Sequence, residues 1–271
     1  MTNYKKISEN IEGKEFTFET GKLAKQADGS VFAQIGDTQV LATVVSSHDA
    51  VDGDFLPLTV NYQEKAFAAG KIPGGFFKRE GRPTEAETLI CRLIDRPLRP
   101  MFPKDYNFPT QIIISVYSAD DVNPPDVLAL TAASAALTVS DIPWDDPIAA
   151  VRVGRVDGKL ICNPSYEEIE NADLNFIVAG SSDAILMVEG GADVAPEDDI
   201  INALMYGHEQ IKKLIEFQKK LVSEDLTKRE FAEKKVDESL VSSVDDIVAN
   251  DISEAATIKS KQERSSKFKE I

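Results

Sequence analysis

The sequence is poor in the residues that build metal centres, disulfide frameworks and charge-relay sites. It contains only two cysteines, Cys91 and Cys162, and only two histidines, His48 and His208. The cysteines lie far apart in no metal-ligand spacing, so we expect two reduced, buried thiols in a cytoplasmic protein. Neither histidine has a nearby Cys, Ser or carboxylate pattern, so structural or surface roles are expected for both.

Long apolar runs are also missing. No run approaches the roughly 20 residues that a membrane-spanning helix needs, and residues 1–13 contain no apolar signal region. A hydrophobic content of 42% with 28% charged residues fits a soluble globular protein that is long enough to bury a large core. The sequence therefore predicts neither membrane insertion nor secretion.

Positive charge is scarce overall and is concentrated in one window. The formal net charge is −16, which excludes a protein that binds nucleic acid through general basicity. Residues 71–100 nevertheless carry 7 Lys and Arg against 4 Asp and Glu, whereas residues 101–196 carry 4 against 15. A polyanion that most of the surface repels would be directed to residues 71–100.

The order of strand and helix patterns predicts an α+β architecture. The pair Asp28-Gly29 predicts a hairpin turn between 22–27 and 30–36, and Asp157-Gly158 predicts a second hairpin within 148–164. Further strands are predicted at 15–20, 38–47, 58–67, 110–118, 174–180 and 184–191, and helices at 84–96, 124–140 and 196–221. After residue 223 the pattern stays helical but becomes polar.

The helix predicted after Pro83 begins at a capping box formed by Thr84 and Glu87. Proline cannot continue a helix, so Pro97 and Pro100 are expected to end it. Five apolar residues recur at helical spacing and are expected to face the core: Ala86, Leu89, Ile90, Leu93 and Ile94.

The other side of the same helix carries arginines. Arg92 and Arg96 lie one turn apart, and Arg99 follows just beyond. Arginine can grip a phosphate through two parallel donors, which favours a phosphate-binding face. A solvated face paired with Glu85 and Asp95 explains the same spacing, so the pattern leaves both readings open.

The segment GGFFKREGRP, residues 74–83, places two phenylalanines beside two cations. Phe76 and Phe77 could pack beneath the loop, which is the commoner role of paired rings. The surrounding glycines instead favour an open loop in which each ring stacks on a base, at about 1–3 kcal/mol, while Lys78 and Arg79 meet phosphate. Because stacking tolerates any base, the second reading predicts sequence-tolerant binding of single-stranded nucleic acid.

Four carboxylates precede the strand predicted at 174–180, namely Glu167, Glu168, Glu170 and Asp173. Carboxylate oxygens are ligands that hard divalent cations prefer, so this segment could bind one. A solvated acidic loop is the more ordinary explanation.

Long stretches of the sequence resemble bacterial polynucleotide phosphorylase. The longest is NYQEKAFAAGKIPGGFFKREGRPTEAETLICRLIDRPLRP, and others are ETGKLAKQADGSV, VNPPDVLALTAASAAL and LNFIVAGSSDAILMVE followed by GHEQ. The similar segments run from about Phe16 to Gln262, in the order that the family has them. A run this long and irregular is a very specific signal.

The resemblance implies two RNase PH-like cores, of the ribosomal protein S5 domain 2-like fold, joined by an all-helical linker and followed by small RNA-binding domains. It assigns residues 1–222 to the first core, with subparts of about 1–146 and 147–222. Residues 223–271 would be the start of the linker.

The resemblance also implies an activity and partners. The family forms a homotrimeric ring and degrades single-stranded RNA from its 3′ end, with inorganic phosphate as nucleophile and nucleoside diphosphates as products. Mg²⁺ is its cofactor, the cytoplasm its location, and other RNA-degradation machinery a further expected partner.

In the family, the loop that matches Phe76, Phe77, Lys78 and Arg79 lines the channel entrance and grips RNA. Four arginines match positions near the RNA path: Arg82, Arg92, Arg96 and Arg99. The family more often has a second arginine where Lys78 stands, which puts a two-donor phosphate contact there in question.

Catalysis in the family resides mainly in the second core, where two aspartates six residues apart hold the metal. Glu167 and Asp173 have this spacing, and we interpret them as a degenerate remnant, since Asn175 replaces a further acidic residue. The chain is therefore expected to supply the RNA-guiding loop and the trimer scaffold, with no catalytic residue or metal site. Two alternatives stay open: a non-catalytic RNase PH-like RNA-binding subunit of an exosome-type ring, and a scaffold whose aromatic loop is packed.

Overall fold

The computed structural model describes residues 4–53, 55–75, 81–144, 146–232 and 238–271. The chain divides into two compact units, Met1–Phe231 and Ala232–Ile271. Among the described residues, no helix is long and apolar enough to cross a membrane.

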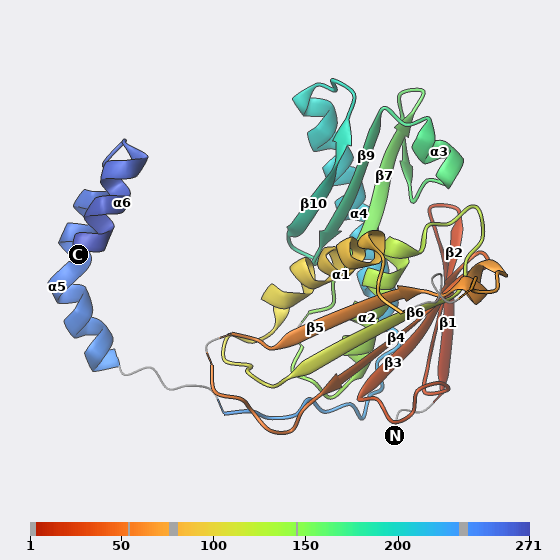
Figure 1. The fold of residues 1–271 in the computed structure, drawn as a ribbon, viewed down its shortest axis with the longest axis horizontal. Helices are drawn as coiled ribbons and strands as arrows, with labels where there is room; N and C mark the ends of the chain where they lie inside the picture. Colours follow the sequence, from red (N-terminus) through yellow and green to blue (C-terminus); the bar gives the residue numbers. More distant parts are fainter. Residues whose placement is uncertain (1–3, 54, 76–80, 145, 233–237) are drawn as a thin grey trace. The chain divides into compact units, whose positions relative to one another are not determined.

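The first unit contains a six-stranded sheet in the order β1-β2-β3-β4-β6-β5 (Figure 1). Its strands are β1 (Lys5–Ile11), β2 (Lys14–Thr20), β3 (Gly29–Ile35), β4 (Thr38–Ser46), β5 (Leu58–Glu64) and β6 (Thr110–Ser118). β5 runs parallel to β6, and the other neighbours are antiparallel. The β-branched run at 38–47 is confirmed as a central strand.

Two features of this sheet differ from the sequence prediction. The pattern does not predict β1, because KKISENI carries only two apolar side chains and lies at the edge of the sheet. Residues 22–27 are not a strand, since β2 and β3 pair directly and residues 21–28 connect them. Asp28 instead accepts a hydrogen bond from the Ser46 N–H at 2.7 Å, which fastens this connection to the end of β4.

A second, four-stranded antiparallel sheet has the order β10-β9-β7-β8. Its strands are β7 (Ala149–Val156), β8 (Lys159–Cys162), β9 (Leu174–Gly180) and β10 (Ile185–Ala192). The hairpin predicted at Asp157-Gly158 is confirmed, with φ of +48° and +73° at the two turn residues. Both values lie in the left-handed region that two-residue hairpin turns require.

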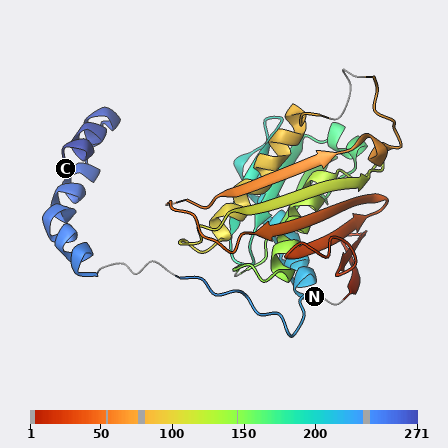
Figure 2. The ribbon, with the colours of Figure 1, turned by 60° about the horizontal axis from the view of Figure 1, so that its bottom comes forward.

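Helices join the two sheets. α2 (Pro125–Val139) packs against β3 and β4 of the first sheet and β7 of the second, and all its residues except Asp126 are buried. α4 (Glu197–Lys219) covers β7 and β9. A Cβ at Gly207 would lie 2.9 Å from the Val153 side chain, so the glycine lets α4 approach the strands closely. In Figure 2 the strands of the six-stranded sheet lie in front of these helices.

α1 (Glu85–Leu98) has the predicted capping box but a shifted buried face. Leu93 and Ile94 are buried as expected, whereas Ala86 is exposed and Leu89 is 58% exposed. Glu87 is buried instead, because its carboxylate accepts hydrogen bonds from the N–H groups of Thr84 at 2.6 Å and Glu64 at 2.8 Å. Pro97 lies inside the helix, which ends one residue later, at Leu98.

The segment after α4 is tied to the first unit. The Lys228 ammonium donates to the carbonyls of Leu137, Thr138 and Ser140 at the end of α2, where the helix dipole favours a cation. Phe231 packs edge-to-face on Tyr106 with ring centroids 5.5 Å apart. The first compact unit extends to Phe231. The linker start that the resemblance implies at residue 223 stays a prediction.

In the described part of the second unit, α5 (Glu238–Ala256) and α6 (Lys261–Glu270) pack on each other. Ser260 caps the start of α6, and its hydroxyl accepts a hydrogen bond from the Glu263 N–H. α5 exposes several apolar side chains, namely Leu240, Val241, Val244, Ile247 and Ile252.

Asp120 holds the loop before α2 against the turn between β3 and β4. Its carboxylate accepts hydrogen bonds from the N–H groups of Asp37 at 3.0 Å, Val122 at 2.9 Å and Asn123 at 2.5 Å. The Asn123 side-chain amide adds a fourth bond at 2.8 Å. Burial alone would raise the pKa of Asp120, but these donors outweigh it and lower the pKa to about 2.

This geometry predicts a specific pH dependence. The folded-state pKa of Asp120 lies below the unfolded value, so its contribution is complete above about pH 4 and is lost as the pH falls towards 2. We expect Asp120→Asn to lower the free energy of unfolding by about 1–2 kcal/mol at pH 7, and the difference from the parent chain to vanish near pH 2. Urea unfolding across this range measures it.

The neighbouring variant Asp121→Asn is the matched control, because Asp121 is exposed. Its effect should stay within about 0.5 kcal/mol at every pH. A difference for Asp120→Asn that is the same at pH 2 and pH 7 would contradict the assigned role.

Candidate nucleic-acid interface

Two arginines of the predicted basic surface have no partner among the residues that the structure describes. Arg82 precedes α1 and Arg92 lies on it, and both are exposed. Neither side chain makes a hydrogen bond or ion pair that involves another described residue, so both guanidinium groups are available to a ligand. Each offers five donors in a planar fork suited to phosphate.

Arg96 is engaged by a carboxylate of the second sheet. Its Nη1 lies 2.6 Å from Oε2 of Glu189 on β10, and the two side chains are 45% and 53% exposed. Such a half-exposed pair is weak, and a phosphate could displace the carboxylate. Glu189 therefore competes with any anion that approaches Arg96, and no sequence signal singles this residue out.

Arg99 has a structural role in the first sheet. Its guanidinium forms a two-donor pair with Asp95, with N–O distances of 3.0 and 2.7 Å. It also donates to the carbonyls of Leu56 at 2.8 Å and Leu58 at 3.3 Å, where β5 begins. Most of its donors are thus used within the fold.

The remaining predicted RNA contacts, Phe76, Phe77, Lys78 and Arg79, lie outside the described residues. Their roles stay predictions from the sequence. The segments on either side are described, and both Gly75 and Arg82 are exposed.

The two carboxylates of the expected remnant do not form a metal site. Glu167 lies on α3 (Tyr166–Glu170), whereas Asp173 precedes β9 and is gripped by Arg155 through two bonds of 2.8 Å. Arg155 lowers the pKa of Asp173 and also binds Asp199 at 2.7 Å. Both oxygens of Asp173 thus face a guanidinium group, which does not fit Mg²⁺. No cluster of three metal-ligating residues occurs in the described ranges.

Asn175 belongs to a different network. It accepts a hydrogen bond from Arg152 at 2.9 Å, and Arg152 also pairs with Asp126 at the start of α2. The Arg152 side chain is only 15% exposed. This network crosses from the second sheet to α2, and the sequence pattern does not predict it.

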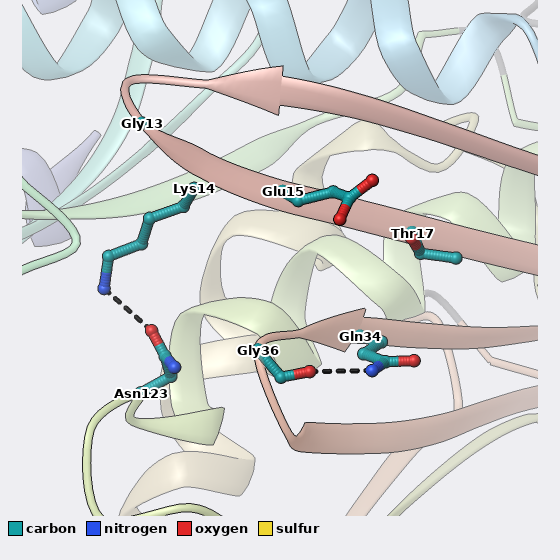
Figure 3. Close-up of a pocket in the computed structure, with 7 residues that line it drawn as sticks. All are labelled: Gly13, Lys14, Glu15, Thr17, Gln34, Gly36 and Asn123. Atoms are coloured by element: carbon teal, nitrogen blue, oxygen red, sulfur yellow. Dashed lines mark hydrogen bonds between the residues drawn. The ribbon is translucent and has the colours of Figure 1, made fainter.

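A polar pocket of about 280 Å³ lies between the β1–β2 turn, the end of β3 and the loop before α2 (Figure 3). Lys14 points to Asn123 and donates to its side-chain oxygen at 2.8 Å. Burial lowers the pKa of Lys14. Across the pocket the Gln34 amide donates to the Gly36 carbonyl at 2.7 Å, so the lining groups largely satisfy one another.

Comparison with known proteins agrees with this architecture. The chain matches the 3′ exoribonuclease family, domain 1, over residues 12–143 and domain 2 over residues 146–210. Solved structures titled as an archaeal exosome core and as rice (Oryza sativa) Rrp46 share the fold, with TM-scores of 0.61 and 0.63 at 19% and 18% identity. They cover 78% and 79% of this chain, and 89% and 97% of their own. The two sheets and their helices thus correspond to domains 1 and 2 of the 3′ exoribonuclease family, and the predicted RNase PH-like α+β fold is confirmed.

Curated relatives narrow the assignment. The polyribonucleotide nucleotidyltransferase of Geobacter sulfurreducens is 52% identical and that of Syntrophotalea carbinolica 51% identical. These alignments cover 100% and 99% of this chain but 39% of each relative. The chain belongs to the polyribonucleotide nucleotidyltransferase family, as the resemblance predicts, and spans about two fifths of the length of these relatives.

The ion pair between Arg96 and Glu189 predicts a gain of affinity. We expect Glu189→Gln to tighten binding of a single-stranded RNA about two- to fivefold, because it removes a competing carboxylate from Arg96. Fluorescence anisotropy at low salt measures this. Glu209→Gln, which breaks an equally exposed pair with Lys212, is the control and should leave affinity unchanged. Weaker binding in Glu189→Gln would show that the carboxylate instead positions Arg96.

Proposed function

We propose that the chain is the RNA-guiding and ring-forming part of a polyribonucleotide phosphorylase. The whole protein degrades single-stranded RNA from the 3′ end by phosphorolysis, with inorganic phosphate as co-substrate and nucleoside diphosphates as products. It acts in the cytoplasm as a homotrimer and associates with other RNA-degradation machinery. The observation that carries the proposal is about 50% identity, along the whole chain, to proteins of that name.

The distribution of charge supports an RNA-guiding role. Residues 71–100 form the positively charged window of an otherwise acidic chain. Within it, Arg82 and Arg92 are exposed without a partner among the described residues, and Arg96 is held only by a half-exposed carboxylate. Cations placed in this way can exchange their partners for phosphates at little cost.

The chemical step belongs to residues outside this chain in our proposal. Mg²⁺ would stabilise charge on the attacking phosphate when bound. The candidate remnant here does not fit the ion, because Arg155 occupies both oxygens of Asp173. We therefore assign no catalytic residue to this chain and derive no step through the metal.

The exosome-type alternative has weaker support. The exosome-related structures are below 20% identical and establish the fold alone. The identity to polyribonucleotide nucleotidyltransferases extends along the whole chain, including the helices after residue 222. A ring subunit without an interdomain linker does not explain that extension.

RNA binding is the first test. We expect the chain to bind unpaired RNA with an affinity that falls steeply as salt rises. The double variant Phe76→Ala, Phe77→Ala should weaken binding at least tenfold, since each stacked base contributes about 1–3 kcal/mol. Arg92→Ala should reduce the slope of log affinity against log salt by about one. An unchanged RNA affinity with a lower melting temperature in the phenylalanine variant would mean that the rings are packed.

Phosphorolysis is the second test. With phosphate, Mg²⁺ and a homopolymeric RNA, this chain alone should release no nucleoside diphosphate above background. The full-length protein, assayed in parallel, should release it readily. Clear turnover by the 271-residue chain would place catalytic groups in this chain and defeat the assignment.

A further inference from the structure

A single carboxylate joins the two ends of residues 65–83, which we call the basic segment. Glu64 is the last residue of β5, and Thr84 is the N-cap of α1. Oε1 of Glu87 accepts a hydrogen bond from the Glu64 N–H at 2.8 Å, and Oε2 accepts one from the Thr84 N–H at 2.6 Å. The chain therefore leaves the sheet and enters the helix at the same side chain, and Glu87 closes the base of the basic segment.

The edge of the sheet explains why this carboxylate is buried. β5 is the last strand in the order of the six-stranded sheet, and α1 packs against it (Figure 1). The Tyr62 N–H donates to Sγ of Cys91 at 3.1 Å, and the Glu64 N–H donates to Glu87, one turn earlier on α1. Two side chains of α1 thus bind donors that the edge of a sheet leaves unpaired. Glu87 is only 9% exposed, because its oxygens replace water at these N–H groups.

The capping box of α3 shows what is unusual about Glu87. There the Glu168 carboxylate accepts hydrogen bonds from the Ser165 N–H at 2.7 Å and from the Ser165 hydroxyl at 2.9 Å. These bonds close a cap within one turn, whereas Glu87 also bonds a residue 23 positions earlier in the chain. Burial alone would raise the pKa of Glu87, but the N–H groups of Thr84 and Glu64 outweigh it and lower the pKa. The ionised carboxylate is therefore the form that closes the base.

The position of Arg82 follows directly from this base. Arg82 is exposed, and its side chain has no partner among the residues that the structure describes. Pro83 stands between it and Thr84, where it fixes its own φ at about −65° and restricts Arg82 to extended backbone. A stiff connection thus links Arg82 to the residue that Glu87 holds. Arg92 differs, because it lies within α1 and the helix backbone sets its position.

We propose that Glu87 is a positioning residue for RNA: by closing the base of the basic segment, its carboxylate holds Arg82 where it meets a phosphate of the strand that Arg92 also binds. The inference rests on the proposed RNA-guiding function. With the base open, the first turn of α1 and the end of β5 would separate, and Arg82 would sample many positions. RNA binding would then require ordering of the basic segment, and the affinity would fall.

Fluorescence anisotropy with a uridine homopolymer at low salt tests this role. We expect Glu87→Gln to weaken binding by the 271-residue chain about five- to tenfold, because an amide oxygen can accept from one N–H while its NH₂ group faces the other. Loss of a negative charge would by itself tighten binding of a polyanion, as expected for Glu189→Gln. A weaker complex therefore reports lost positioning.

A double-mutant cycle separates positioning from a merely structural role. In an Arg82→Ala background, Glu87→Gln should change the RNA affinity by less than about twofold, because the side chain that it positions is gone. In an Arg92→Ala background it should keep its full effect. Equal weakening in all backgrounds would show a general loss of structure and overturn the proposal.

Glu168→Gln is the matched control, since it neutralises the corresponding carboxylate of the α3 capping box and should leave the RNA affinity within about twofold of the parent chain. Glu87→Asp keeps the charge but is one methylene too short to reach both N–H groups, so it should also weaken binding. It replaces Glu87→Gln if that variant does not fold. Unchanged or tighter RNA binding by either folded Glu87 variant overturns the proposal.

Failure of this role and failure of the proposed function give different results. A parent chain that binds no RNA would overturn the RNA-guiding function and the role of Glu87 with it. A parent chain that binds RNA, with the same affinity in Glu87→Gln and Glu87→Asp, would overturn only the role of Glu87.

Discussion

The shared burial of α2 is the constraint on which both sheets depend. This helix lies against β3 and β4 on one side and β7 on another, and Asp126 is its one residue that is not buried. Alanine at many of its positions lets backbone and strand approach closely, at the cost of little side-chain entropy. Hydrogen bonds also fix both ends of the helix. Asp120 and Asn123 fasten the loop before it, and the Lys228 ammonium donates to carbonyls of its last turn and of its C-cap residue, Ser140.

Carboxylates of this chain pair with several of its arginines and so limit how many are available to a ligand. Arg99 and Arg155 hold strands and loops in place through two-donor pairs with Asp95 and Asp173. Arg96 is only loosely engaged, whereas Arg92 is free among the described residues. A count of arginines in the sequence therefore overstates the number available to RNA. The electrostatics of the site depends on which acidic partner the fold brings within reach.

The outer face of four strands of the six-stranded sheet differs from the rest of the surface because it lacks charged side chains. On the outer face of β3, β4, β5 and β6 the side chains are uncharged, although the chain is strongly acidic and its edges and helices carry the charge. The inner face of the same strands is fully accounted for by α1 and α2. The outer face of these strands carries exposed aromatic and aliphatic groups, among them Val45, Ile113 and Tyr117.

Much of the fold follows from the sequence, because its signals are local. The capping box of Thr84 and Glu87, the Asp157-Gly158 turn and the central strand β4 each depend on neighbours a few residues away. The hydrophobic pattern does not predict the edge strand β1, because most of its side chains are solvated. Its strand conformation depends on pairing with β2. The buried face of α1 differs from the prediction, because Glu87, a charged residue, is buried with its carboxylate bonded to two backbone N–H groups. Only the tertiary structure decides that Arg96 pairs with Glu189, 93 residues away, and that Arg155 pairs with Asp173. The reason is that ion pairs depend on distance in space, whereas the sequence gives only distance along the chain.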